Sequence, residues 1–194
     1  MVKIGIVALI PYGEITKYFA NVQVLEYVEN TYNVFIEGRK FNKSDIILVS
    51  NGYPWINHVP VTLFLANSEK DVGIEKEDEY AGIELCMPTE VNSKTKSFLN
   101  THEGRTLNLT HGKYKEVSQI DSLDNLARIV QAQKSNKKSI IKRGFKQANT
   151  MMVRNCDHIL VFGLTAEPEG EFWDKIHCEK EYYDITNLLG LVCS

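Results

Sequence analysis

The sequence predicts an α/β fold of the Rossmann-like kind, in which about five mostly parallel strands form a sheet with helices on both faces. Short, β-branched apolar runs alternate along the chain with longer segments whose apolar residues recur at helical spacing, and such alternation is typical of parallel β-α-β units. The first of these runs is apolar at almost every position, as expected of a strand buried on both faces of a sheet. With 194 residues, 43% of them hydrophobic and 24% charged, we expect one domain spanning residues 1–194.

The first half of the chain alternates strongly between the two patterns. In chain order, it is expected to contain a strand at 3–9, a helix that begins near residue 15, a short additional strand at 34–36, a strand at 46–50, a helix over 59–67 and a strand at 82–87. Pro88 ends the last of these strands, because proline cannot donate a ladder hydrogen bond. These elements make two consecutive β-α-β units.

The second half opens with a polar stretch, residues 89–112, that shows no clear period. We expect it to form an irregular insertion around residues 89–120, because a long structureless loop in a compact domain is usually functional or mobile. Beyond it, the sequence predicts helices over 121–134 and 140–155, a strand at 157–163, a helix that begins near residue 172, a last strand at 182–185 and a short helix at 188–189.

Composition excludes several classes of protein. A formal net charge of -3 argues against a dedicated nucleic-acid binder, and no apolar run approaches the roughly 20 residues that cross a membrane. The sequence begins without a signal-peptide pattern, so we expect a cytoplasmic protein. The four cysteines have no CxxC spacing, and His102 and His111 fit no zinc pattern. No P-loop and no complete G-x-G-x-x-G is present. We therefore expect neither a metal nor a cofactor.

A candidate ligand site lies where the predicted strands end. In a parallel sheet with right-handed crossovers, the bends at residues 8–13, 50–57 and 163–170 meet at the carboxyl edge. The Ser50-Asn51-Gly52 turn leads from a strand toward a helix, so its backbone N–H groups suit an anion such as phosphate. An ordinary strand-to-helix turn is the alternative.

Further binding residues are expected beside these bends. Trp55 is placed to stack on a nucleobase, or else to pack at the start of the second helix against the core. Arg143 and Arg154 are eleven residues apart, close to three helical turns, so one helix face could present both to a phosphate. A solvated basic face is the alternative. Asn149 precedes a buried strand, and we expect its side chain to point toward the sheet edge.

Three segments together resemble the Rossmann-like superfamily that joins the DNA-processing protein A fold to the Lonely Guy phosphoribohydrolases. The first strand is similar to its K-I-x-I-x-G opening, residues 50–57 to its S-G-G-A-x-G-x-D turn, and residues 149–157 to its R-N-x-x-M-x-x-x-x-D stretch. Gly163 and Gly170 stand where its glycine-threonine loop should be. Asn57 replaces the aspartate of the turn, and Asp174 stands where the loop's glutamate would fall.

This resemblance implies a ligand and leaves three functions open. The first is binding of a nucleotide or nucleotide-derived small molecule. The second is an enzyme that cleaves or transfers at a nucleotide N-glycosidic bond, with Asp174 and Glu171 as its carboxylates. The third is an interaction protein whose crevice is vestigial and whose insertion contacts a partner. The resemblance also implies a homodimer, and the apolar helix face of Leu123, Leu126 and Val130 is its candidate seam.

Overall fold

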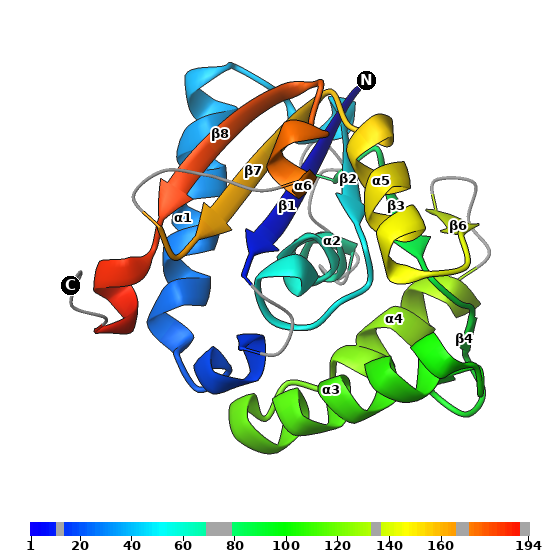
Figure 1. Cartoon of the computed structure of the whole chain (residues 1–194). Coiled ribbons are helices and arrows are strands. Elements are labelled where there is room, and N and C mark those ends of the chain that lie inside the picture. The colour runs from blue at the N-terminus through cyan, green and yellow to red at the C-terminus, as the bar shows by residue number, and fades with distance from the viewer. Residues whose placement is uncertain (11–13, 69–78, 133–136, 166–170, 191–194) are drawn as a thin grey trace.

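The protein contains one six-stranded parallel sheet with the strand order β6-β3-β2-β1-β7-β8, shown in Figure 1. The computed structural model describes residues 1–10, 14–68, 79–132, 137–165 and 171–190. The strands of the sheet are β1 (Val2–Leu9), β2 (Ile46–Ser50), β3 (Gly82–Met87), β6 (Lys137–Ile141), β7 (His158–Gly163) and β8 (Glu179–Asp184). Every neighbouring pair in it is parallel. The predicted α/β class is confirmed.

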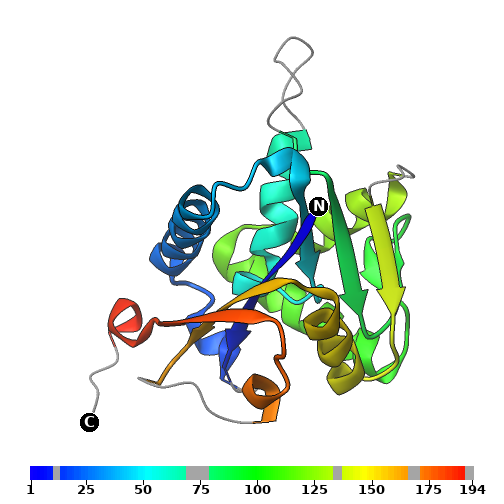
Figure 2. The same ribbon diagram turned by 90° about the horizontal axis from the view of Figure 1, so that it is seen from above.

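Helices cover both faces of this sheet. They are α1 (Val22–Gly38), α2 (Val59–Ser68), α3 (His102–Ser118), α4 (Ser122–Gln131), α5 (Phe145–Asn155) and α6 (Glu171–Asp174), with short 3-10 turns η1 (Ile15–Tyr18), η2 (Lys43–Asp45), η3 (Trp55–His58) and η5 (Thr186–Leu189). Figure 2 shows α1 and α2 on one side of the sheet and α5 and α6 on the other. The result is a three-layer sandwich.

Strand alternation divides the apolar side chains between two cores. Ile4 and Ile6 of β1 belong to the core that α1, α2, α3 and α4 cover, whereas Val7 belongs to the core under α5 and α6. This follows from the period of two along a strand. Gly5, between Ile4 and Ile6, lets α5 approach the sheet, because a Cβ there would lie 2.9 Å from both Cys156 Sγ and Met152 Cε.

The expected irregular insertion is instead largely regular. It contains a two-stranded antiparallel hairpin, β4 (Val91–Asn92) and β5 (Ser97–Phe98), followed by the seventeen residues of α3. The sequence looked irregular because α3 places polar residues in the interior: Thr110 and His111 are buried beside Leu107 and Tyr114. Thr101 caps the helix by accepting a hydrogen bond from the N–H of Gly104.

Two further segments differ in type from the prediction. Residues 34–36 are not a strand but part of α1. The helix expected over 140–155 is a strand followed by a helix: β6 pairs with β3, and α5 begins only at Phe145, after Gly144 adopts a φ of 91°. The lysines of β6 concealed this strand, which has polar residues because it lies at the edge of the sheet.

Candidate functional site

The strand order reverses beside β1, and this reversal marks the candidate site. From β1 the chain adds β2, β3 and β6 on one side, then returns to place β7 and β8 on the other. In open α/β sheets, ligands bind outside the carboxyl ends of the strands at such a switch point. Leu9 of β1 pairs with Gly163 of β7, and β2 ends at Ser50 on the other side of β1. The predicted bends that follow Ser50 and Gly163 therefore start from the same edge of the sheet, the one at the carboxyl ends of the strands. Gly170 lies outside the described residues.

The β2 loop (residues 51–54), which follows β2, is fixed by buried side chains. Ser50 Oγ donates to the carbonyl of Asn57 at 2.8 Å and accepts from the N–H of Gly52 at 3.2 Å. Asn57 Oδ1 accepts from the N–H of Ala8 at 3.1 Å, which ties the loop to the end of β1. Because both side chains are buried, Ser50 and Asn57 support the loop from within.

Gly52 and Trp55 have structural reasons for their identity. Gly52 has a φ of 76°, and a Cβ there would lie 2.8 Å from Met87 Cγ. Trp55, in the first position of η3, is completely buried and stacks on Tyr18 with ring centroids 6.2 Å apart. The core alternative for Trp55 is thus the one observed, and its indole has no exposed face on which a base could stack.

Asn51 and Asn149 are brought together from distant parts of the chain. Asn51 Nδ2 donates to Asn149 Oδ1 at 3.2 Å, and this contact links the β2 loop to the second turn of α5. Asn51 is buried and Asn149 is partly exposed. As expected from the sequence, Asn149 points toward the carboxyl edge. It is a predicted ligand residue that is partly exposed at this edge.

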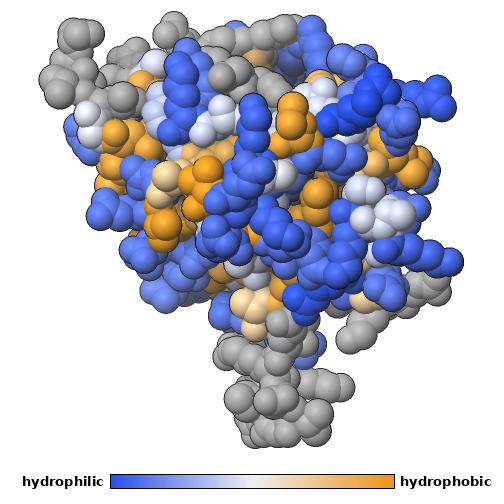
Figure 3. Space-filling model, turned by 90° about the horizontal axis from the view of Figure 1, so that it is seen from below, coloured by the Kyte–Doolittle hydropathy of each residue, from blue (hydrophilic) through white to orange (hydrophobic). Residues whose placement is uncertain are grey.

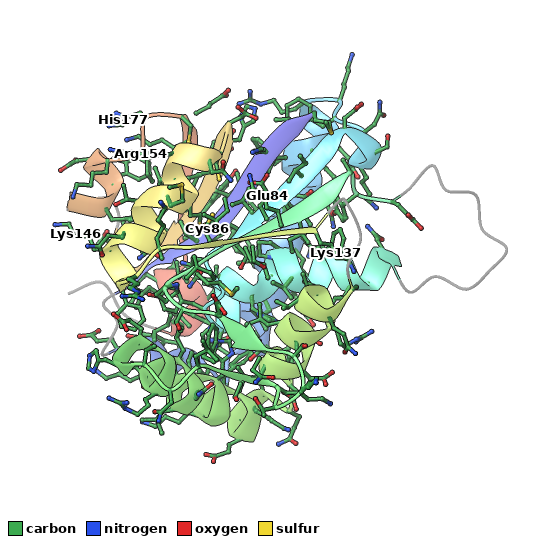
Figure 4. The ribbon with its side chains drawn as sticks, turned by 90° about the vertical axis from the view of Figure 1, so that its right-hand side faces the viewer. Glu84, Cys86, Lys137, Lys146, Arg154 and His177 are labelled. Atoms are coloured by element: carbon green, nitrogen blue, oxygen red, sulfur yellow. The ribbon has the colours of Figure 1, made fainter. Side chains whose placement is uncertain are left out.

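The predicted cations do not share a helix face. Arg143 is exposed in the segment before α5, whereas Arg154 is exposed in the last turn of α5. Figure 4 shows Lys146 and Arg154 at opposite ends of this helix, and eight residues correspond to about 12 Å along the axis. The prediction that Arg143 and Arg154 act together is therefore wrong, and only Arg143 lies at the carboxyl edge.

The amino end of α5 combines basic side chains with a first turn that contains no acidic residue. Gly144, the N-cap, supplies no side-chain cap, and the first turn contains no acidic residue. Lys142 and Arg143 come directly before it and both are exposed. Because a helix N-terminus carries a partial positive charge, these side chains add like charge to it. An anionic group placed here would be stabilised.

Asp174, one of the two predicted carboxylates, does not lie at this rim. Asp174 is exposed and follows Trp173, whose carbonyl accepts from Lys180 Nζ at 3.0 Å. Lys180 pairs with Ile159 near the start of β7, so α6 lies toward the amino ends of the strands, as Figure 1 also shows. The side chain of Glu171 lies outside the described residues. Asp174 therefore cannot act together with Asn51 and Asn149.

Gly163 has a packing role at the end of β7. A Cβ on it would lie 2.2 Å from the hydroxyl oxygen of Tyr182, and that hydroxyl donates to the carbonyl of Thr165 at 2.8 Å. The glycine thus leaves room for a tyrosine that holds the first residues of the next bend.

Sequence reasoning missed a buried histidine pair behind the β2 loop. His111 Nδ1 lies 2.7 Å from Ser122 Oγ, and its Nε2 lies 2.9 Å from the carbonyl oxygen of Gly52. His58 Nε2 lies 3.3 Å from Asn125 Nδ2, and the two imidazole centroids are 6.3 Å apart. Burial lowers the pKa of His58 to about 3 and that of His111 to about 4, so both rings are neutral. The helical spacing of Leu107, His111 and Tyr114 is the sequence signal that could have identified His111 as a buried residue.

The proposed dimer seam is already occupied within the chain. Leu126 is completely buried, and Leu123 and Val130 pack against the same core, so this face is not free to meet a second copy. Figure 3 shows the face below the carboxyl edge, where hydrophobic residues form groups separated by hydrophilic ones.

Within the described ranges, no group of three or more metal-binding side chains occurs. No helix of those ranges is long and apolar enough to span a membrane.

Comparison with known proteins gives one clear relationship. No family model matches the chain. The chain is 30% identical over 159 residues to Uncharacterized protein R261 of Acanthamoeba polyphaga mimivirus, and the match covers 79% of this chain and 79% of that protein. The match thus extends over most of both chains.

Proposed function

The chain belongs to the same family as the mimivirus protein, and we propose that it binds a nucleotide or a nucleotide-derived molecule at the carboxyl edge of its sheet. One observation carries the proposal. The hydrogen bond between Asn51 and Asn149 joins the β2 loop to the start of α5, at the rim where the strand order reverses. Loops at such a reversal are where α/β folds bind nucleotides.

Charge supports a phosphate as part of the ligand. The amino end of α5 has no acidic residue in its first turn, and Lys142 and Arg143 precede it. A phosphate there would accept hydrogen bonds from the first backbone N–H groups of the helix and would offset the accumulated positive charge. The resemblance to the DNA-processing protein A and Lonely Guy superfamily supports the same class of ligand.

Binding is favoured over cleavage. Hydrolysis or transfer at an N-glycosidic bond needs a carboxylate beside the reacting carbon. Asp174 lies on α6 toward the amino ends of the strands, and the two side chains that join the β2 loop to α5, Asn51 and Asn149, are uncharged amides. The protein therefore acts as a binding protein in this proposal.

A thermal-shift panel tests it. The panel contains nucleotides, the matching nucleosides, sugar phosphates and cyclic signalling nucleotides. A ligand at about 100 times its Kd stabilises the native state by about 2.7 kcal/mol, which raises the Tm of a chain of this size by about 5 to 10 °C. We expect a phosphorylated member to do so and its nucleoside to do less. If no member of the panel raises the Tm, the proposal fails.

Matched charge reversals locate the site. Arg143→Glu places a negative charge at the amino end of α5, and we expect it to abolish the shift caused by the best nucleotide. Lys94→Glu makes the same change on the exposed turn of the β4–β5 hairpin and should leave the shift intact. Equal losses in the two variants would show that net charge, not this site, governs binding.

A further inference from the structure

We infer that Asn149 presents its amide nitrogen to the ligand as a hydrogen-bond donor, and that His111 is the positioning residue that fixes this orientation. The inference rests on the proposed function and names the group that meets Asn149: a phosphate oxygen, which only accepts. It is drawn from an uninterrupted hydrogen-bond chain, the His111–Asn149 chain, in which each donor determines the next acceptor.

The first link fixes the imidazole of His111. Its Nε2 lies 2.9 Å from the carbonyl oxygen of Gly52, and a carbonyl only accepts, so Nε2 must carry the hydrogen. In a neutral ring Nδ1 then has a lone pair, and it accepts from the hydroxyl of Ser122 at 2.7 Å. His111 and Ser122 are both buried, so water does not compete for either contact.

The second link passes through one peptide unit of the β2 loop. The carbonyl of Gly52 accepts from His111, and the N–H of the same peptide, which belongs to Tyr53, donates to Asn51 Oδ1 at 3.2 Å. His111 thereby holds the plane of the peptide that orients Asn51. The positive φ of Gly52 allows this plane to face α3.

The last link sets the amide of Asn149. Because Asn51 Oδ1 is committed to an N–H, the other amide atom of Asn51 is a donor, and the atom of Asn149 that it meets at 3.2 Å must be the oxygen. Oxygen and nitrogen of an amide are otherwise hard to distinguish, but here the chain of donors settles the choice. Asn149 Nδ2 then has both hydrogens available, with no partner among the residues that the structure describes.

The aligned donors make the rim selective for an acceptor. Successive hydrogen bonds in one direction polarise one another, and the outward end of this chain is a donor on a partly exposed side chain. It lies in the second turn of α5, and Arg143 lies in the segment just before the first turn. Both groups therefore favour a phosphate oxygen over a ligand hydroxyl or amine that needs an acceptor.

Isothermal titration of the full chain with AMP and adenosine tests the donor role. Asn149→Asp preserves the acceptor for Asn51 but replaces the outward donor with a carboxylate oxygen. Since a hydrogen bond to a charged group contributes about 1.5 to 3 kcal/mol, we expect AMP affinity to fall about tenfold or more and adenosine affinity to change little. Unchanged AMP affinity would overturn the inference.

Substitutions of His111 test its positioning role. His111→Leu removes the donor to Gly52, whereas the side-chain amide of His111→Gln can replace it. We expect the first variant to weaken AMP binding, measured well below its Tm, and the second to restore it. A purely structural role would lower the Tm of His111→Leu without this loss and recovery of affinity, and that result would refute the positioning role.

A ligand-independent measurement separates this inference from the proposed function. The side-chain amide resonances of Asn149, assigned in a ¹H–¹⁵N NMR spectrum by their loss in Asn149→Asp, should shift in His111→Leu and return in His111→Gln. If these resonances respond while no nucleotide binds, the hydrogen-bond chain stands and the proposed function fails. If they do not respond, the inference fails whatever the protein binds.

Discussion

The two buried histidines should make folding stability depend steeply on mild acid. Burial lowers the pKa of His58 to about 3 and that of His111 to about 4, from an ordinary value of 6.5. His58 Nδ1 also lacks a hydrogen-bond partner within the described part of the chain. Below pH 6.5 the unfolded chain therefore binds two protons that the folded chain excludes. The free energy of unfolding must fall with pH from about 6.5 until the folded pKa values are reached.

The magnitude follows from the number of protons. Each histidine contributes up to about 1.4 kcal/mol per pH unit, so the pair contributes about 2.7 kcal/mol per unit. Because the unfolded histidines are only half protonated at pH 6.5, the full slope is reached below that pH, and between pH 6.5 and pH 5 the free energy of unfolding should drop by about 3 kcal/mol, measured against a typical total of about 5 to 15 kcal/mol. Carboxylates titrate mainly below this window, so the histidines dominate it.

Urea denaturation followed by circular dichroism at pH 7.0, 6.0 and 5.0 measures this dependence. His111→Gln removes one of the two groups and should reduce the slope by about half. His102→Gln changes an exposed histidine at the start of α3 and should leave the slope unchanged. A wild-type stability that is constant within about 1 kcal/mol from pH 7 to pH 5 would refute the reasoning.

Other predictions concern the loop and the insertion. Gly52→Ala should lower the free energy of unfolding by about 1 to 3 kcal/mol, because of its positive φ and the approach to Met87; Gly112→Ala, in α3 with open space around it, should raise it by about 1 kcal/mol. Chemical denaturation of the two variants checks the opposite signs. Asn57→Ala leaves a β1 backbone N–H without its acceptor and should cost about 1 to 3 kcal/mol by the same assay. Leu126→Ala should cost about 2 to 5 kcal/mol, and sedimentation velocity should show the same mass as wild type, since this side chain packs within one chain.

The strands that could be predicted from the sequence are those whose side chains are buried on both faces of the sheet. The apolar runs of β1, β2, β3 and β7 are buried on both faces, so their composition alone identified them. Edge strand β6 was missed because it has only one neighbour, and its lysines tolerate solvent. Helix α3 was missed because polar residues make up part of its buried face.

The site was predictable only as far as it depends on local turns. The residues from Ser50 to Asn57 and Asn149 could be selected from strand ends and helix starts, and the structure places them at one rim. The roles of Ser50, Asn57 and Trp55 could not be inferred, because burial decides that they support the loop instead of meeting solvent. Contacts with His111 depend on an insertion whose position no local pattern indicates.

The placement of β8 has a consequence for shortened forms of the protein. β8 is the outermost strand beside β7, and its charged residues Glu179, Lys180 and Glu181 discourage pairing with strands of other molecules. β7 is almost entirely apolar and buried. A chain that ended at residue 177 would uncover the backbone of β7 along its whole length, and such an edge is a template for aggregation. By covering the edge of β7, β8 therefore protects the protein against aggregation as well as completing the sheet.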